Sequence, residues 1–265
     1  MVLFILFPGL GINKKIWELT HNNKKLIKLN FLNELKKIGD VYTYTPNVYK
    51  FEYYKQYDGK IKKLENEFKE KPNDISLNQM NIRKECERIY DEVKSYKGKF
   101  IPIGHSAGGW FAYKFTKMYK KRCEKLILIE SGYITKDDSQ KLIKFKTNNK
   151  NYDNITNIDL QKLTEKMIKH NNNKELFKKL YEIIVYKYNK TMGKLNGKVY
   201  CPTLFFENIN ISDKEHNETI EKYQKELYKI NGNKIQFINM INTGHFPWEI
   251  PEYSYQMIKQ IKCFV

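Results

Sequence analysis

The chain has 265 residues and a formal net charge of +18, because 48 lysines and arginines outnumber 30 aspartates and glutamates. Its 15 phenylalanines, 20 tyrosines and 3 tryptophans can fill a core, which argues against intrinsic disorder, and 13 glycines and 7 prolines exclude a collagen-like chain. The 4 cysteines form no C-x-x-C pair, which excludes a zinc ribbon and a thioredoxin motif.

The positive charge is spread along the whole chain among asparagine, isoleucine and tyrosine residues. No arginine cluster, RNP-like motif or zinc-finger spacing accompanies it, so nucleic acid is disfavoured as a partner. Peripheral contact with an anionic membrane is compatible with the charge, but no apolar run reaches the ~20 residues that cross a bilayer. The apolar residues 1–7 lack the charged flank and cleavage site of a signal peptide, and we expect a cytoplasmic protein.

The first 103 residues predict strands that alternate with helices. In chain order these are a strand over 2–7, a loop over 8–11, a helix over 16–38, a strand over 41–45, a helix from Asp74 or Ser76 to 97, and a strand over 100–103. Gly39 ends the first helix, and residues 49–72 favour no single element. The continuous apolar run over 2–7 is typical of a strand that is buried on both faces of a parallel sheet.

The alternation continues to the end of the chain, with one long interruption. The predicted elements are a helix that ends near 121, a strand over 126–129, Lys-rich helices within 131–198, a strand over 202–206, a helix over 215–230, a strand over 234–238 and a helix over 251–261. This order predicts an α/β fold with a doubly wound, mainly parallel sheet and helices on both faces. We expect residues 131–198 to form a helical cap inserted into a core of residues 1–130 and 199–265.

The segment Gly104-His105-Ser106-Ala107-Gly108 matches the pattern G-x-S-x-G. It follows a predicted buried strand and precedes a predicted helix, which is the setting of a nucleophile elbow. In such an elbow the serine sits on a sharp turn, and its hydroxyl lies at a helix N-terminus that favours negative charge. The alternative is a glycine-rich turn with an inert serine.

Serine is a weak nucleophile and needs a base. His245 lies in a loop after the last predicted strand, which can bring its imidazole over Ser106. We expect His105, which adjoins the serine, to point away from it. The other three histidines, His21, His170 and His216, lie in polar stretches and are expected to be solvated.

Three segments together resemble the α/β-hydrolase superfamily, and the resemblance spans nearly the whole chain. They are Phe7-Pro8-Gly9-Leu10-Gly11 with Trp17, the segment Gly104-His105-Ser106-Ala107-Gly108-Gly109, and the run from Gly244 through His245 to Glu252. The chain is most similar to small capped carboxylesterases that cleave methyl esters or thioesters. The resemblance implies a six-stranded sheet, because the chain starts at what would be the family's third strand.

The resemblance also implies roles for individual residues. Ser106 would be the nucleophile, and His245 would be the general base and then the general acid. The backbone N–H groups of Ala107 and Leu10 would form the oxyanion hole, where a donor contributes about 3–4 kcal/mol. No cofactor or metal is implied. Pro8 stands where many members have a histidine, which is usually structural there.

The acidic member of the triad is less clearly marked. Its usual place in the family is the loop after the strand over 202–206, where Asp213 is the expected acid. An ionised carboxylate there would hold the imidazole tautomer. The alternative role for Asp213 is to cap the helix that starts near residue 214. Glu130 is the rival acid, because some members place the acid after the preceding strand, and Glu207 comes third.

The function that these motifs predict is a serine hydrolase that cleaves a carboxylic ester or thioester through an acyl-enzyme on Ser106. Its substrate would be a small molecule, an acyl carrier or a lipid ester. One alternative is lipase-like or lysophospholipase-like action at anionic membranes. Another is a catalytically silent binding protein, since a fold does not determine a function.

Overall fold

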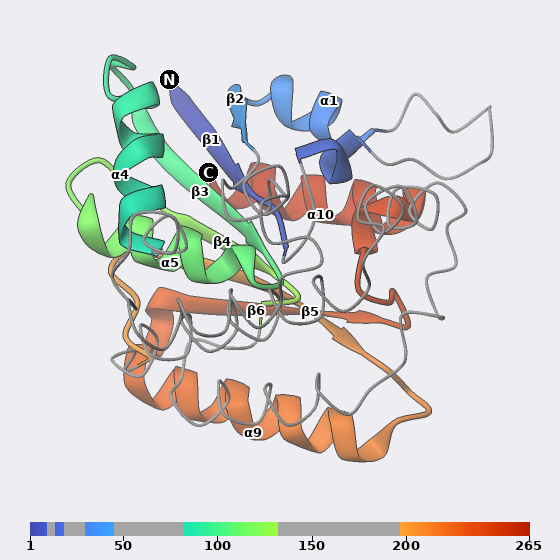
Figure 1. The fold of residues 1–265 in the computed structure, drawn as a ribbon. Helices are drawn as coiled ribbons and strands as arrows, with labels where there is room; N and C mark the ends of the chain where they lie inside the picture. Colours follow the sequence, from blue (N-terminus) through green and yellow to red (C-terminus); the bar gives the residue numbers. More distant parts are fainter. Residues whose placement is uncertain (10–13, 19–29, 45–81, 132–196) are drawn as a thin grey trace, which may run out of the picture.

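The computed structural model describes residues 1–9, 14–18, 30–44, 82–131 and 197–265 (Figure 1). The predicted cap, residues 131–198, lies almost entirely outside the described residues, as do Leu10 and the ambiguous segment 49–72. No helix in the described part of the chain combines the length and the apolar character needed to cross a membrane.

The core is a sheet of six strands that are all parallel to their neighbours. Its spatial order is β2-β1-β3-β4-β5-β6. The strands are β1 (Val2–Phe7), β2 (Asp40–Thr43), β3 (Lys99–His105), β4 (Leu126–Ile129), β5 (Thr203–Ile209) and β6 (Ile235–Ile241). The predicted six-stranded, doubly wound parallel sheet is thereby confirmed.

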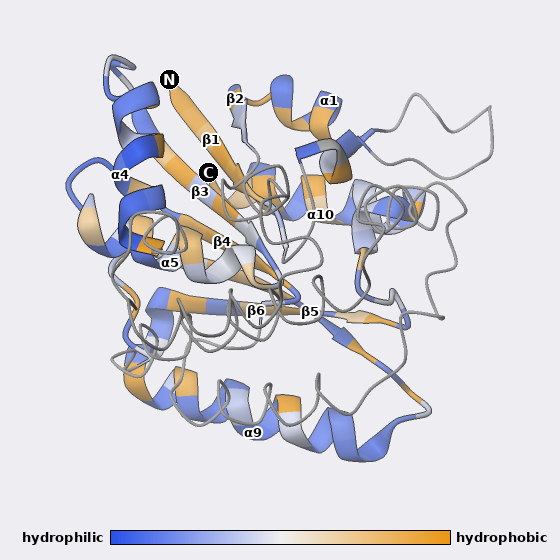
Figure 2. Ribbon diagram, viewed as in Figure 1, coloured by the Kyte–Doolittle hydropathy of each residue, from blue (hydrophilic) through white to orange (hydrophobic). Residues whose placement is uncertain are grey.

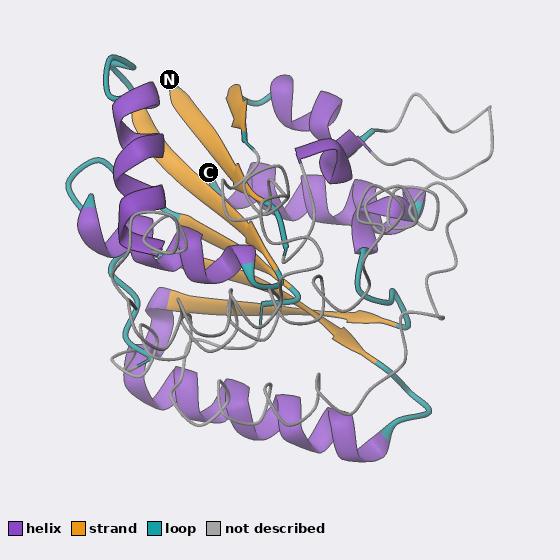
Figure 3. Cartoon of the chain, viewed as in Figure 1, coloured by secondary structure: helices purple, strands orange, loops and turns teal. Residues whose placement is uncertain are grey.

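Helices cover both faces of this sheet (Figure 3). On one face α1 (Phe31–Lys36) and α10 (Pro251–Phe264) contribute to one hydrophobic cluster. On the other face α4 (Ile82–Val93), α5 (Gly108–Met118) and α9 (Lys214–Asn231) contribute to a second cluster. The strands between them are mostly hydrophobic, whereas the outer surface of α9 is hydrophilic (Figure 2).

Strand β1 shows why a continuous apolar run forms the centre of such a sheet. Leu3, Ile5 and Phe7 pack into the cluster with α4 and α5, whereas Phe4 and Leu6 pack into the cluster with α1 and α10. Successive side chains point to opposite faces of a strand, so a strand that is covered on both sides needs apolar residues at every position.

Several predicted elements have other bounds in the structure, and β6, for example, runs on to Ile241. Within the predicted helix over 16–38, the structure has a 3-10 helix, Lys14–Glu18, and a separate α1 whose N-cap is Asn30. The Asn30 side chain accepts hydrogen bonds from the backbone N–H groups of Leu32 and Asn33, which starts a new helix there. Strand β5 runs on to Ile209, because its last residues pair with β6 even though they are largely polar.

The strand order places the loops after β1 and β3 next to each other. The chain moves from β1 to β2 on one side and returns to add β3 on the other side, so the direction of winding reverses between β1 and β3. Ligands of open α/β sheets bind outside the carboxyl ends of the strands at such a reversal. The loop with Gly9 and the turn at Ser106 both lie there.

Candidate active site

Ser106 occupies a sharp turn between β3 and α5. Its φ is 50°, a left-handed conformation that a residue with a side chain rarely adopts. Three hydrogen bonds hold the turn: Ser106 N–H donates to the Ile129 carbonyl at 3.0 Å, and the Ser106 carbonyl accepts from Gly109 N–H at 3.0 Å and from Ser131 Oγ at 2.7 Å. The surrounding structure therefore enforces the strained backbone at Ser106, which is the backbone conformation of a nucleophile elbow.

Glycines let the elbow form because other groups occupy the space of their missing side chains. A Cβ atom on Gly104 would lie 2.4 Å from Gly109 Cα, and one on Gly108 would lie 2.1 Å from the Phe7 carbonyl oxygen. A Cβ atom on Gly109 would lie 1.6 Å from Ser131 Oγ. Helix α5 can approach β1 and β3 this closely only without these side chains.

The loop after β1 lies against the nucleophile. A Cβ atom on Gly9 would be 3.2 Å from Ser106 Cβ and 3.1 Å from His105 Nδ1. Ala107, one of the two expected oxyanion donors, is buried at the N-cap of α5. The other expected donor, Leu10, directly follows Gly9 in the sequence but lies outside the described residues.

His245 lies in the loop after β6, where the sequence places it, and several contacts hold that loop. The Asn208 side-chain oxygen accepts from Thr243 N–H at 2.8 Å and from Thr243 Oγ1 at 3.2 Å. Gly244 has a φ of 66°, which turns the chain sharply just before the histidine. His105 Nε2 lies 2.8 Å from the His245 carbonyl oxygen. Because a carbonyl only accepts, this contact requires that the proton of His105 be on Nε2.

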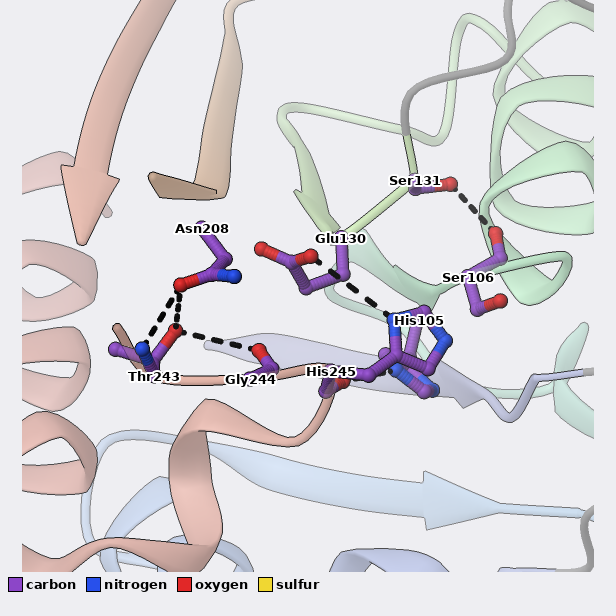
Figure 4. Close-up of polar contacts among 8 residues, drawn as sticks. All are labelled: His105, Ser106, Glu130, Ser131, Asn208, Thr243, Gly244 and His245. Atoms are coloured by element: carbon purple, nitrogen blue, oxygen red, sulfur yellow. Dashed lines mark hydrogen bonds and ion pairs between the residues drawn. The ribbon is translucent and has the colours of Figure 1, made fainter. Parts of the chain in front are cut away.

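Glu130 is the carboxylate that contacts His245. It follows β4 directly, has a φ of 49°, and is held by a 2.9 Å hydrogen bond from its N–H to the Phe206 carbonyl. Its Oε2 lies 3.9 Å from His245 Nδ1. Figure 4 shows the His245 imidazole between the Glu130 carboxylate and the side chain of Ser106. The structure thus brings together the nucleophile, the base and the rival acid named from the sequence.

Asp213 has a different environment. It is the exposed N-cap of α9, where its Oδ1 accepts from His216 N–H at 2.9 Å and its carbonyl accepts from Asn217 N–H at 3.1 Å. Within the described contacts of His245, the carboxylate is supplied by Glu130 and not by Asp213. The capping role that the sequence left open for Asp213 is the one its side chain has here.

His105 has a structural role at the site that its sequence position did not reveal. Its ring packs among aromatic side chains, with centroids 4.7 Å from Trp248, 5.0 Å from Phe246 and 6.3 Å from Trp17. Trp248 Nε1 in turn donates to the Ile16 carbonyl at 3.0 Å. The contacts of His105 link the strand that leads into the elbow with the loop of His245. The local sequence around His105 could not predict this contact, because its partner, His245, lies 140 residues further along the chain.

Glu207 is a second carboxyl group beside Glu130. It lies on β5, is only 5% exposed, and follows Phe206, to which Glu130 is hydrogen-bonded. Burial raises the pKa of Glu207 well above its usual value, and the negative charge of Glu130 raises that pKa further.

Among the described residues, no group of three or more His, Cys, Asp and Glu side chains is arranged to hold a metal ion. The described site thus consists of a strained serine, an imidazole and carboxyl groups. Such a set can carry out nucleophilic and general acid–base chemistry.

No family model and no curated protein sequence matches the chain. Solved structures do resemble it. An esterase from a marine microorganism is 16% identical, with a TM-score of 0.51 over 99% of this chain and 95% of its own. A peroxisomal α/β-hydrolase from Saccharomyces cerevisiae is 14% identical, with a TM-score of 0.51 over 99% of this chain and 76% of its own.

A meta-cleavage product hydrolase from Pseudomonas fluorescens is 12% identical, with a TM-score of 0.56 over 99% of this chain and 89% of its own. Identities this low establish architecture only, and here the architecture agrees with the parallel sheet and the elbow between β3 and α5. The chain therefore has the α/β-hydrolase fold.

Proposed function

We propose that the protein is a serine hydrolase that cleaves a carboxylic ester or thioester. The observation that carries this proposal is the position of the His245 imidazole between the Glu130 carboxylate and Ser106, which is held at a φ of 50° (Figure 4). A serine in a strained elbow with an adjacent imidazole is the arrangement needed to activate a hydroxyl group. The esterase and hydrolases with the same fold support the same class of reaction.

In this mechanism Ser106 Oγ attacks the acyl carbon while His245 Nε2 takes the hydroxyl proton. The carbonyl oxygen becomes an alkoxide, which the N–H of Ala107, and that of Leu10 as expected from the sequence, would stabilise. The leaving alcohol or thiol departs with the proton from His245 and leaves an acyl-enzyme. A water molecule then gives its proton to His245 and attacks the acyl carbon, which releases the acid and restores Ser106.

We propose Glu130, rather than Asp213, as the acid of the triad. A carboxylate beside Nδ1 keeps the Nδ1–H tautomer and stabilises the imidazolium that forms during attack. The Glu130–His245 separation of 3.9 Å exceeds a hydrogen bond, but catalytic contacts often shorten when substrate binds. Asp213 is engaged by the N-terminus of α9, so it would have to leave that cap to serve His245.

Labelling with a fluorophosphonate probe, read by intact mass, tests the proposed function. We expect one adduct on the wild-type protein and none on Ser106→Ala or His245→Ala, since either change removes activation on the order of 10⁴-fold or more. Ser212→Ala, an exposed serine in the loop before α9, is the matched control and should label like wild type. A folded wild-type protein without an adduct, or an adduct that persists in Ser106→Ala, would overturn the proposal.

The substrate class is proposed from the position of the segment that follows Glu130. Ser131, the last described residue before that segment, donates its hydroxyl proton to the Ser106 carbonyl, so the segment begins beside the nucleophile. We propose that residues 131–198 form a cap over the site that selects the acyl group. A series of p-nitrophenyl esters and acyl thioesters of increasing chain length measures this selection. Preference for long chains, with a rate increase on anionic vesicles, would favour the lipase-like alternative.

A further inference from the structure

Glu130 and Glu207 occupy neighbouring positions at the carboxyl end of the sheet. Ile129 pairs with Phe206 in the register between β4 and β5, and Glu130 N–H donates to the Phe206 carbonyl at 2.9 Å. The residue that follows each member of this pair is a glutamate: Glu130 directly after β4, and Glu207 within β5. On its other side, Glu207 pairs in register with Asn239 of β6, which carries no charge.

Among the described residues, one oxygen of each carboxyl group lacks a hydrogen-bond donor. Oε1 of each glutamate is buried and has no partner among the described residues, although Oε2 of Glu130 lies near His245. Ionised carboxylates only accept hydrogen bonds, and the negative charge of Glu130 opposes the ionisation of Glu207. One proton on the pair supplies the missing hydrogen-bond donor. It also leaves a single negative charge, so the repulsion between two ionised carboxylates does not arise.

Glu207 is the member that keeps the proton. It is more deeply buried than Glu130, whose side chain is 11% exposed, and burial disfavours the ionised form. Within the described residues, Glu130, which follows β4, is the charged group that acts on Glu207, and His245 from the loop after β6 contacts Glu130. The burial and charge that raise the pKa of Glu207 agree with this assignment.

We infer that Glu207 is a positioning residue that shares its proton with Glu130 and so holds the Glu130 carboxylate against His245 Nδ1. This inference rests on the proposed function, in which Glu130 is the acid of the triad. The pair would then present one negative charge to the imidazole. When Glu207 loses its proton as pH rises, the second charge repels Glu130, and the support for His245 is lost.

The test compares Glu207→Gln with Glu207→Leu. Glutamine is neutral and can donate to Glu130, whereas leucine has a similar size but no donor. The first measurement is the rate constant of fluorophosphonate labelling at Ser106 as a function of pH. The second is the titration of the His245 imidazole by NMR, which needs no reactive serine. Glu85→Gln removes the charge of a buried carboxylate on α4, distant from the site, and is the matched control.

We expect Glu207→Gln to label within about twofold of wild type at pH values where Glu207 is protonated, but without the decline that wild type shows as Glu207 loses its proton. We expect Glu207→Leu to label about 10- to 100-fold more slowly, the range for a lost hydrogen bond to a charged group. The NMR signals of the His245 imidazole should differ from those of wild type in Glu207→Leu and stay near wild type in Glu207→Gln, while Glu85→Gln should change neither measurement.

Unchanged labelling and an unchanged His245 titration in Glu207→Leu would overturn the inference. If Glu207→Leu fails to fold, Glu207→Gln decides, because a decline with rising pH identical to that of wild type would also overturn it. Absence of labelling in wild type at every pH would refute the proposed function instead. In that case the His245 titration still tests whether Glu207 holds Glu130 against the imidazole.

Discussion

The turns at Ser106 and Glu130 follow two adjacent strands, β3 and β4, and both hold a non-glycine residue at positive φ, 50° and 49°. Glycines surround the first turn, because α5 packs so closely that added Cβ atoms would clash with the backbone. Among the described residues no glycine flanks the second turn, where Glu130 N–H donates to the Phe206 carbonyl. Two turns with similar positive φ values can therefore differ in how clearly the local sequence predicts them.

The two turns are also connected. Ser131 Oγ donates to the Ser106 carbonyl at 2.7 Å, and the Ser106 N–H donates to the Ile129 carbonyl at 3.0 Å. Each strained residue thus helps to hold the other. Backbone strain of this kind persists only where the surrounding contacts over-determine it, and it concentrates at functional sites.

The largest expected effect tests whether the acid of the triad is Glu130 or Asp213, the acid expected from the sequence. Glu130→Gln should lower kcat by about 10²–10⁴-fold, because the imidazole loses the charge that orients it and stabilises its protonated form. Asp213→Asn should stay within about threefold, since asparagine is an equally good N-cap and the site is untouched. Steady-state kinetics on an ester substrate measures both, and the opposite ranking would restore Asp213 as the acid.

A second test breaks the elbow through packing alone. Gly108→Ala places a Cβ atom 2.1 Å from the Phe7 carbonyl oxygen, and we expect it to lower the free energy of unfolding by at least about 3 kcal/mol. Gly232→Ala is the control, because Gly232 has a φ of 54° but nothing within 4 Å of an added Cβ. It should cost about 1–2 kcal/mol from backbone strain only. Equal losses in urea denaturation would contradict the steric explanation.

A third test uses pH and concerns Glu207, the buried carboxyl group beside the Glu130 turn. The native pKa of Glu207 is raised well above its ordinary value of 4.5, so the native state keeps a proton that the unfolded chain releases. Its contribution to stability is complete below about pH 4.5 and is lost as pH rises through the native pKa. The Tm of wild type relative to Glu207→Gln should therefore fall as pH rises above about 4.5. A constant difference would mean that Glu207 is ionised in the native state.

The smallest expected effect is on the hydrogen bond that joins the two turns. Ser131→Ala removes the donor to the buried Ser106 carbonyl, and we expect a loss of about 1 kcal/mol of stability together with slower fluorophosphonate labelling. Ser212→Ala should change stability by less than about 0.5 kcal/mol. Loss of stability with an unchanged labelling rate would show that the bond supports the fold without positioning the nucleophile.

Several features of the fold could be predicted from local sequence. The apolar run over 2–7 predicts β1 because a strand covered on both faces needs apolar residues throughout. The glycines around Ser106 predict the elbow, since they mark the places where backbones approach closely. The length of β5 could not be predicted in this way. Glu207, Asn208 and Ile209 join the sheet because β6 offers paired backbone groups, and side-chain patterns do not report that pairing.

The sequence by itself determined the strand run of β1, the strained turn at Ser106 and the place of His245 after the last strand. Each of these depends on contacts between residues that are close in the chain or on a motif with its own steric requirements. Only the tertiary structure decided which carboxyl groups lie near the imidazole. Glu130, Glu207 and His245 come from three different strand ends, and their proximity is set by the order and register of β4, β5 and β6.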